Sequence, residues 1–256
     1  MGLFRKSSKT PKGASDQKLA SSGATYNSKR IAGVVVAKNK QLREDLRSTE
    51  YPTLNFVLLR PLIAFALTKK RELNVFDLGG GGGTHYFVAK KFIDSEIELK
   101  WAVIETPAMV AEAQSLREPG LSFFENSDSA SRHLGIIDIA IASSVFQYLK
   151  DPLDALEDFL NLEAQYIFIT RTALSNEIAP IFEIQKSRLK DNGPGRMPVG
   201  YEDEEIRYPL TVVNKNAFRK ILETKYEIIC EIEEDTSVHR IGTISIDQFG
   251  FLCRKK

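Results

Sequence analysis

One segment, Val75–Thr84 (VFDLGGGGGT), constrains the fold of this chain more than any other. An apolar run ends in an aspartate and is followed by five consecutive glycines. Glycine has the most backbone entropy to lose on folding, so five in a row stabilise neither a helix nor a strand. Between a strand and a helix they let the backbone approach a ligand more closely than residues with side chains can. The segment therefore predicts a strand, a ligand-binding loop and a helix with Thr84 as its N-cap.

Length and composition fit one large domain, or one domain with an appendage. The 256 residues are 43% apolar, which is enough for a sizeable core. A net charge of +1 gives no global argument for nucleic acid as a partner, and we expect none. The first 30 residues carry a net charge of +6 and the remainder −5. We expect residues 1–13 to be a disordered basic tail, with contact to a membrane surface or an anionic polymer as the alternative.

No apolar region follows the basic start as a secretory signal would require. The longest apolar stretch, Thr53–Leu67, is interrupted by Arg60-Pro61 and is too short to cross a bilayer. Cys230 and Cys253 lack the spacing of a metal site and lie in apolar segments, so we expect buried thiols and no metal. These features predict a cytoplasmic protein.

Strand and helix patterns alternate from residue 73 onward. Strands are expected at Leu73–Leu78, Leu99–Glu105, Leu121–Phe124, Ile136–Ser143, Gln165–Thr170, Tyr226–Ile232 and Gly242–Cys253. Helices are expected at Thr84–Phe92, Pro107–Leu116, Asp151–Leu162 and Asn216–Thr224. The alternation predicts an α/β fold, a doubly wound and mostly parallel sheet with helices on both faces. The last two strands leave no room for a crossover helix, so at least one of them is antiparallel.

Two regions lie outside this plan. Residues 14–70 are expected to form an N-terminal helical segment, with helices at Ile31–Leu46 and Thr53–Lys70. The main domain would then span residues 71–256, with an insertion at Ser175–Asn214. A connection of this length inside a compact domain is functional or disordered. Its tyrosines, arginine and prolines favour an ordered lid.

Polar residues follow the expected strands at the point where each strand ends. Ligands of open parallel sheets bind at this edge, so we expect these residues to form a cofactor pocket. They are Asp77 and Gly79–Gly83 after strand one, Glu105 at the end of strand two, Glu125, Asn126 and Asp128 after strand three, Ser143, Ser144, Gln147 and Tyr148 after strand four, and Thr170-Arg171-Thr172 at strand five.

The glycine spacing discriminates between cofactors. A dinucleotide loop of the form GxGxxG does not fit, because its third glycine would fall on Thr84 or His85. Only Gly79-x-Gly81-x-Gly83 fits, and it follows Asp77. An acid at the mouth of the loop disfavours a pyrophosphate and favours a ligand that carries an ammonium and a sulfonium. Glu105, 22 residues after the last glycine, can accept hydrogen bonds from both hydroxyls of a ribose.

These motifs carry a resemblance to a known family. Asp77 with the three spaced glycines, the acid Glu105, and DIAIASSVFQYLKDP (Asp138–Pro152) resemble the motifs of class I S-adenosylmethionine-dependent methyltransferases. A closer similarity covers most of the chain: FDLGGGGGTHY, LKWAVIETPAMV, SSVFQYLKDP, the TRT of strand five, Tyr208-Pro209 and the terminal GFLCRKK resemble a bacterial group of methyltransferases associated with cell-surface polysaccharide or O-antigen biosynthesis.

The resemblance implies a Rossmann-like, seven-stranded sheet with a C-terminal antiparallel strand, and S-adenosyl-L-methionine as the cofactor. It places the glycine loop beside the methionine moiety, with Asp77 near the amino group and Glu105 at the ribose. By the same resemblance the residues after strand three, Asn126 and Asp128, flank the adenine, and Ser143 and Ser144 lie near the transferring methyl group.

The catalytic candidates are His85, Arg171 and Tyr148. Many small-molecule O-methyltransferases place a histidine base after strand four, but the matching residue here is Gln147, which cannot act as a base. His85 follows the glycine loop, and histidine is the side chain most often used as a general acid or base. Arg171 suits an anionic substrate such as a phosphate or a uronate, with a salt bridge to the acidic run Glu202–Glu205 as the alternative.

Tyr148, Tyr201 and Tyr208 are expected to line an acceptor site or to pack in the core or lid. The sequence thus predicts an S-adenosylmethionine-dependent methyltransferase acting at oxygen of a small-molecule or glycan-related acceptor. Two alternatives stay open: a non-catalytic protein that binds the same cofactor, and an NAD-dependent sugar-modifying oxidoreductase, which the glycine spacing and Asp77 disfavour.

Overall fold

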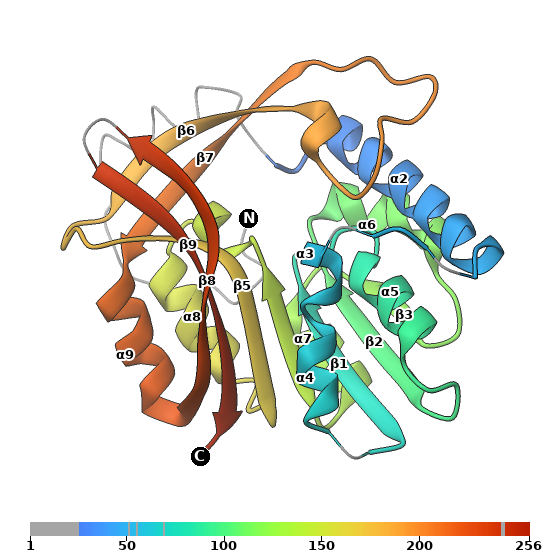
Figure 1. Cartoon of the computed structure of the whole chain (residues 1–256), viewed down its shortest axis with the longest axis horizontal. Coiled ribbons are helices and arrows are strands. Elements are labelled where there is room, and N and C mark those ends of the chain that lie inside the picture. Colours follow the sequence, from blue (N-terminus) through green and yellow to red (C-terminus); the bar gives the residue numbers. More distant parts are fainter. Residues whose placement is uncertain (1–25, 51, 55, 69, 242–243) are drawn as a thin grey trace.

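A computed structural model of the chain describes residues 26–50, 52–54, 56–68, 70–241 and 244–256 (Figure 1). The expected disordered tail, residues 1–13, lies outside the described residues, as does the start of the expected N-terminal helical segment.

A parallel sheet of five strands forms the centre of the molecule, in the order β3-β2-β1-β4-β5. The strands are β1 (Glu72–Leu78), β2 (Glu98–Ile104), β3 (Leu121–Phe124), β4 (Ile139–Ser143) and β5 (Tyr166–Ser175). The order reverses between β1 and β4, and this reversal is the switch point at which doubly wound sheets bind ligands. The predicted α/β class is therefore confirmed.

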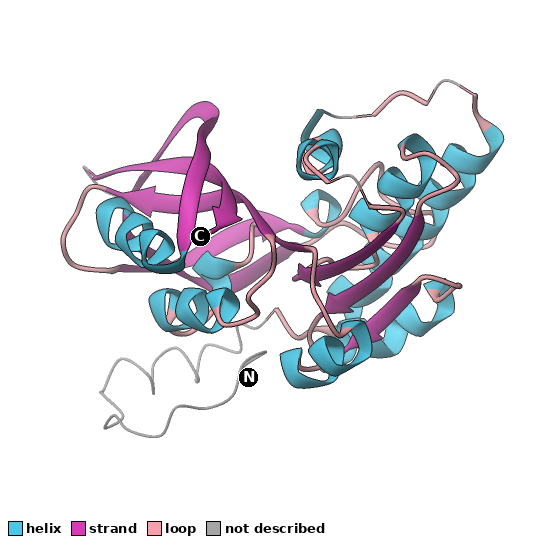
Figure 2. Ribbon diagram, turned by 90° about the horizontal axis from the view of Figure 1, so that it is seen from below, coloured by secondary structure: helices cyan, strands magenta, loops and turns pink. Residues whose placement is uncertain are grey.

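The chain ends in an antiparallel hairpin of β8 (Tyr226–Ile241) and β9 (Ile244–Lys255). β9 also pairs antiparallel with β5, from Tyr166↔Arg254 onward, so the hairpin extends the central sheet (Figure 2). The expected C-terminal antiparallel strand is thus confirmed, in the order β3-β2-β1-β4-β5-β9-β8, and two further strands from the insertion bring the sheet to nine strands rather than the expected seven.

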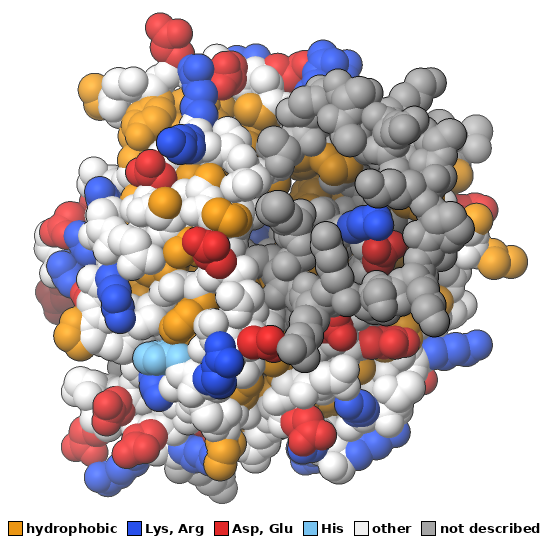
Figure 3. All heavy atoms as spheres, turned by 180° about the vertical axis from the view of Figure 1, so that it is seen from behind, with side chains coloured by type: hydrophobic (Ala, Val, Ile, Leu, Met, Phe, Trp, Pro, Cys, Tyr) orange, Lys and Arg blue, Asp and Glu red, His pale blue; other side chains and the backbone are white. Residues whose placement is uncertain are grey.

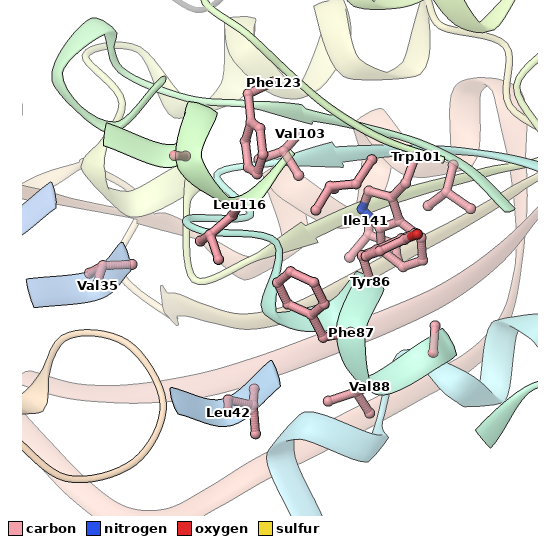
Figure 4. Packing of buried hydrophobic residues seen from close by; sticks show 14 of the residues in the cluster. Val35, Leu42, Tyr86, Phe87, Val88, Trp101, Val103, Leu116, Phe123 and Ile141 are labelled. Carbon is pink, nitrogen blue, oxygen red and sulfur yellow. The ribbon is translucent and has the colours of Figure 1, made fainter. Parts of the chain in front are cut away.

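Helices cover both faces of this sheet. They are α5 (Thr84–Phe92), α6 (Pro107–Ala113) with the 3-10 turn η1 (Gln114–Leu116), α7 (Ser127–Leu134), α8 (Pro152–Leu160) and α9 (Lys215–Lys225). One core cluster joins Val75, Trp101 and Val103 to α5 and α6. Figure 4 shows part of it, including Tyr86 beside Trp101. A second cluster joins the alternate residues Phe76 and Ala102 to α7, α8 and α9.

The structure corrects several local predictions. Helix α7 was not expected, because only Ser127, Ala130 and Leu134 of its eight residues are buried, which leaves almost no apolar periodicity. The N-cap of α5 is Gly83, in the left-handed conformation, and Thr84 is the first helical residue. Cys230 is exposed, whereas Cys253 is buried as expected.

The N-terminal helical segment begins with the long helix α2 (Lys29–Ser48). Its N-cap is Ser28, whose side chain accepts a hydrogen bond from the N–H of Ile31. The expected helix Thr53–Lys70 is instead two short helices, α3 (Phe56–Leu59) and α4 (Leu62–Ala66). The break falls at Arg60-Pro61, because proline lacks the N–H and disfavours helical backbone in the residue before it.

The expected insertion is a β-hairpin arm. It consists of β6 (Ile181–Arg188), the turn η3 (Leu189–Asp191) and β7 (Glu205–Asn214). β7 pairs in parallel with the end of β5 at Leu174↔Val213, and the arm then runs across the molecule to α2 (Figure 1). The residues of the arm from η3 to Glu204 are called the arm tip below.

Candidate functional site

The glycine loop follows β1 and needs glycine for steric reasons. Gly79, Gly81 and Gly83 have φ angles of +68°, +58° and +82°, which side-chain-bearing residues rarely adopt. A Cβ on Gly79 would lie 2.7 Å from Cγ2 of Val145, and one on Gly80 would lie 2.5 Å from Oδ2 of Asp77. The loop is therefore held tightly between the ends of β1 and β4.

Asp77 lies beneath this loop and is fully buried. Nε1 of Trp101 donates to its Oδ2 over 3.1 Å, and Nδ1 of His85 lies 3.4 Å from the same oxygen. Its other oxygen, Oδ1, has no hydrogen-bond partner among the described residues. A buried carboxylate oxygen without a donor is costly, so this atom is available to a cationic or hydrogen-bonding ligand group.

Glu105 closes the other side of the loop. The N–H of Gly81 donates to its Oε1 over 3.1 Å, and the N–H of Thr106 donates to its Oε2 over 2.9 Å. Burial, together with the nearby charge of Asp77, raises the pKa of Glu105 from 4.5 to about 7. Each oxygen keeps a further acceptor position, because an ionised carboxylate has roughly four.

The ends of β4 and β5 form a second group of contacts. Nε and Nη2 of Arg171 donate to Oγ of Ser143 over 3.3 and 3.0 Å. Nε2 of Gln147 donates to Oγ of Ser144 over 3.0 Å and to the carbonyl oxygen of Arg171 over 3.2 Å. Ser144 and Arg171 have φ angles of +55° and +54°, and such strained residues concentrate at binding and catalytic sites.

Three tyrosines meet beside this group. Tyr26 stacks on Tyr148 with 6.1 Å between ring centroids, and Tyr208 meets both rings edge-on, at 5.5 and 5.2 Å. The hydroxyl of Tyr148 donates to Oε1 of Gln185 on β6 over 3.0 Å. Burial, together with the charge of Glu105, raises the pKa of Tyr26. The cluster therefore lies between the glycine-loop side of the site and the arm.

Helix α2 packs directly on the glycine loop. Asn39 is fully buried, and its Oδ1 accepts from Oγ1 of Thr84 over 2.7 Å. A Cβ on Gly82 would lie 2.8 Å from Nδ2 of Asn39. Just before the helix, Oδ1 of Asn27 accepts from the N–H of Ala108 at the start of α6. The N-terminal segment thus crosses the strand-end edge of the sheet.

The structure brings some predicted site residues together and separates others. Asp77, Glu105 and the glycines form one group with His85, while Ser143, Ser144, Arg171 and Tyr148 form the other. Asn126 is the N-cap of α7, its Oδ1 accepting from the N–H of Ser129, and Asp128 is exposed in the first turn.

The structure also adds residues that the sequence reasoning missed. Trp101 contacts the predicted site residue Asp77, and Tyr26 contacts Tyr148. Asn39 contacts Thr84, directly after the glycine loop. The side chains of residues 235–240, including His239, lie outside the description. Tyr201 packs near Gly33 of α2 instead of joining the tyrosine cluster.

Other features do not add a second site. Two surface hollows of about 410 and 370 Å³ lie at the amino ends of the strands, near Lys100 and Asn74, where doubly wound sheets do not place ligands. Within the described ranges, no three His, Cys, Asp or Glu side chains are grouped as metal ligands would be. In the same part of the chain, every helix is too short or too polar to cross a membrane.

Comparison with known proteins gives matches in structure only. No family model and no curated protein sequence matches the chain. The [4+2]-cyclase SpnF has a TM-score of 0.50 at 14% identity, over 78% of this chain and 80% of that one. The N-terminal domain of EvdMO1 with S-adenosylhomocysteine bound has a TM-score of 0.49 at 10% identity, over 85% of this chain and 97% of that one. The glycopeptide N-methyltransferase MtfA, complexed with the same molecule, has a TM-score of 0.45 at 12% identity, over 82% of this chain and 93% of that one. At these identities the likeness concerns the fold alone.

Proposed function

We propose that this chain is an S-adenosylmethionine-dependent methyltransferase that acts at oxygen of a small-molecule or glycan-related acceptor. One observation carries the proposal: two buried carboxylates, Asp77 and Glu105, flank a strained glycine loop at the switch point between β1 and β4. The motifs that resemble a bacterial group of polysaccharide-associated methyltransferases support the choice of a glycan-related acceptor.

The residues present fit this cofactor in their donor and acceptor chemistry. The free Oδ1 of Asp77 suits the ammonium of the methionine moiety, and the remaining acceptor positions of Glu105 suit two ribose hydroxyls. The same two acids disfavour the pyrophosphate of a nicotinamide dinucleotide. When bound, the cofactor supplies a methyl group on a sulfonium as the electrophile.

The chain's own contribution is mainly to bind and orient. Ser143, Ser144 and Arg171 lie at the ends of β4 and β5, beside the tyrosine cluster, and would hold the acceptor there. Alignment of two reactants supplies roughly 7–11 kcal/mol of barrier reduction. Gln147 fixes Ser144 and the backbone of Arg171 through its amide. Among the catalytic candidates, Arg171 and Tyr148 serve the acceptor side, and His85, beside Asp77, serves the cofactor side.

A non-catalytic cofactor-binding protein is the second candidate. Many of the small-molecule O-methyltransferases that the motifs resemble carry a histidine base after strand four, and this chain has Gln147 at that position. Detecting an acceptor that gains one methyl group separates the two candidates.

Calorimetric titration of the full chain with S-adenosylmethionine, S-adenosylhomocysteine and NADH tests the cofactor. We expect micromolar binding of the first two only. Glu105→Gln should weaken binding of S-adenosylhomocysteine by about 1.5–3 kcal/mol, since its hydrogen bonds to the ribose are charge-assisted. Glu98→Gln, an exposed acid at the other end of β2, is the matched control and should change nothing. Binding of NADH without binding of either sulfur nucleoside would refute the proposal.

A further inference from the structure

Arg171 carries a positive charge that the described part of the chain does not neutralise. Among the described residues, the only hydrogen-bond acceptor of its guanidinium is Oγ of Ser143, a neutral hydroxyl, which is contacted by Nε and Nη2. No described carboxylate lies within ion-pair distance of its guanidinium, and Nη1 donates to no described atom. Burial lowers the pKa of Arg171. Guanidinium groups in such surroundings are ordinarily paired, because a desolvated lone charge is costly.

The carboxylate of Glu234, which interacts electrostatically with Arg171, is already paired with other groups. Glu234, whose side chain is 1% exposed, pairs with Arg60 and accepts from the hydroxyl of Thr170. The charge of Glu234 therefore acts on Arg171 from a distance, whereas both of its oxygens are bonded to Arg60 and Thr170.

Three of the four acids in the run Glu202–Glu205 are paired as well. Asp203 pairs with Arg188, Glu204 with Arg30 and Glu205 with Arg207, while Glu202 is exposed. The internal salt bridge that the sequence allowed for Arg171 is therefore not formed.

The backbone of Arg171 is shaped to present this side chain. The register of β5 against β9 shifts between Ile169 and Thr172, and Arg171 in that bulge has a φ of +54°. Bulges of this kind re-aim a side chain beside a site. Gln147 donates a hydrogen bond to the carbonyl oxygen of Arg171. The guanidinium of Arg171 interacts electrostatically with Tyr26 and Tyr148 of the tyrosine cluster. Arg171 thus combines a strained backbone, a hydrogen-bonded carbonyl and an unneutralised charge.

We propose that Arg171 binds the anionic group, a carboxylate or a phosphate, of an acidic acceptor whose body lies against Tyr26 and Tyr148, with the buried Tyr208 packed behind them. The planar guanidinium matches both kinds of oxyanion, and its Nη1 donors are available for a two-point contact. Aromatic side chains beside the charge supply an apolar wall for a sugar or aromatic ring. This substrate class makes the proposed function more specific, and its methylation depends on that proposed function. Anion binding, in contrast, depends on Arg171 alone.

The test titrates the full chain, saturated with S-adenosylhomocysteine, with glucose, glucuronate, glucose 1-phosphate and inorganic phosphate, and repeats the titration without the nucleoside. We expect at least one anion to bind at least tenfold more tightly than glucose, and the preferred anion distinguishes a carboxylate from a phosphate acceptor. Arg171→Gln should remove this preference. Arg254→Gln removes an exposed, paired arginine of β9, which lies opposite Tyr166 at the start of β5, and should leave the preference intact.

Thermal unfolding separates a binding role from a structural one. Removing an unneutralised, half-buried charge should leave the melting temperature of Arg171→Gln unchanged or higher, and phosphate or the preferred acid should stabilise the wild type but not this variant. The proposal is overturned if no anion elicits an Arg171-dependent response in either measurement, or if Arg171→Gln lowers the melting temperature while binding anions as the wild type does. Anion binding without nucleoside binding would instead remove the proposed function and leave this site standing.

Discussion

At the scale of single residues, Glu105 combines burial with the acceptor role proposed for it. Its pKa near 7 means that the folded chain holds the proton more tightly than the unfolded chain, where the value is 4.5. The contribution of the protonated carboxyl to stability is therefore present below pH 4.5 and is lost as the pH rises to about 7. Cofactor hydroxyls donate to the ionised form, so cofactor binding favours loss of this proton.

This gives a pH dependence for cofactor binding. We expect the affinity for S-adenosylhomocysteine to rise about tenfold between pH 6 and pH 8, with proton release on binding, because ionisation of a group with a pKa near 7 is completed over that range. Calorimetry in buffers of different ionisation enthalpy measures both quantities. Glu105→Gln should flatten the profile and Glu98→Gln should not; a wild-type affinity independent of pH would contradict the assignment.

A second residue-scale prediction concerns the glycine loop. Gly79 and Gly195 both have positive φ, but a Cβ on Gly195 meets nothing within 4 Å, whereas one on Gly79 meets Val145. Gly195→Ala should therefore cost about 1–2 kcal/mol of stability, from backbone strain alone. Gly79→Ala should cost about 2–5 kcal/mol, because overpacking adds to the strain. Urea denaturation measures the difference, and equal losses would mean that Val145 moves aside freely.

The sequence identified the chemical pair Asp77 and Glu105 but not the residues that hold them. Asp77 lies opposite Val103 in the parallel register of β1 and β2, which brings Trp101, two residues earlier, onto the same face as the aspartate. Parallel register between strands separated by a helix leaves no local pattern in the sequence. The contact of Trp101 with Asp77 therefore had to come from the structure.

At the scale of elements, the predictions succeeded where apolar periodicity was strong. The strands of the central sheet were predicted because they are rich in apolar residues, most clearly in β4, whose five residues are all buried. Helix α7 was missed because its residues are small and polar, although Asn126 and Asp128 are an N-cap and a first-turn acid. The arm was predicted as an ordered lid; it is ordered β structure, and its action as a lid stays a proposal.

Helix α2 offers a test of how an element is fixed to the site. Asn39 is its buried polar anchor on the glycine loop, through Thr84. Asn39→Ala should destabilise the fold by about 1–3 kcal/mol, because the hydroxyl of Thr84 loses its acceptor and a buried polar contact is left unmade. Gln41→Ala, which removes an exposed hydrogen bond to Asp45 on the same helix, should cost about 0.5 kcal/mol or less. Equal losses in denaturant unfolding would show that α2 is not anchored through Asn39.

At the scale of the whole molecule, α2 joins two parts of the chain that are far apart in sequence. On one side it contacts the glycine loop, and on the other it contacts the arm tip, where Nζ of the buried Lys38 donates to the carbonyl of Lys190. Arg30 pairs with Glu204 of the same arm tip. The space-filling view of the reverse face shows acidic and basic side chains interspersed with apolar ones (Figure 3). A hydrogen bond and an ion pair therefore connect α2 to the arm tip.

This connection predicts that cofactor binding is sensed by the arm. Binding of S-adenosylhomocysteine should slow amide hydrogen exchange in the glycine loop, in α2 and in the arm tip together, because ordering the loop also orders what packs on it. Lys38→Met keeps the buried aliphatic stem but removes the bond to Lys190. In this variant the slowing should persist in the loop and in α2 and be reduced at least threefold in the arm tip.

The matched control is Lys40→Met, which changes an exposed lysine of the same helix and should behave as the wild type. If the arm tip slows equally in both variants, coupling runs instead through the contact of Tyr148 with Gln185 on β6, and Gln185→Ala should then abolish it. If the arm tip never responds to the nucleoside, the arm is a fixed wall of the site rather than a lid. The packing of α2 between the loop and the arm then serves stability alone.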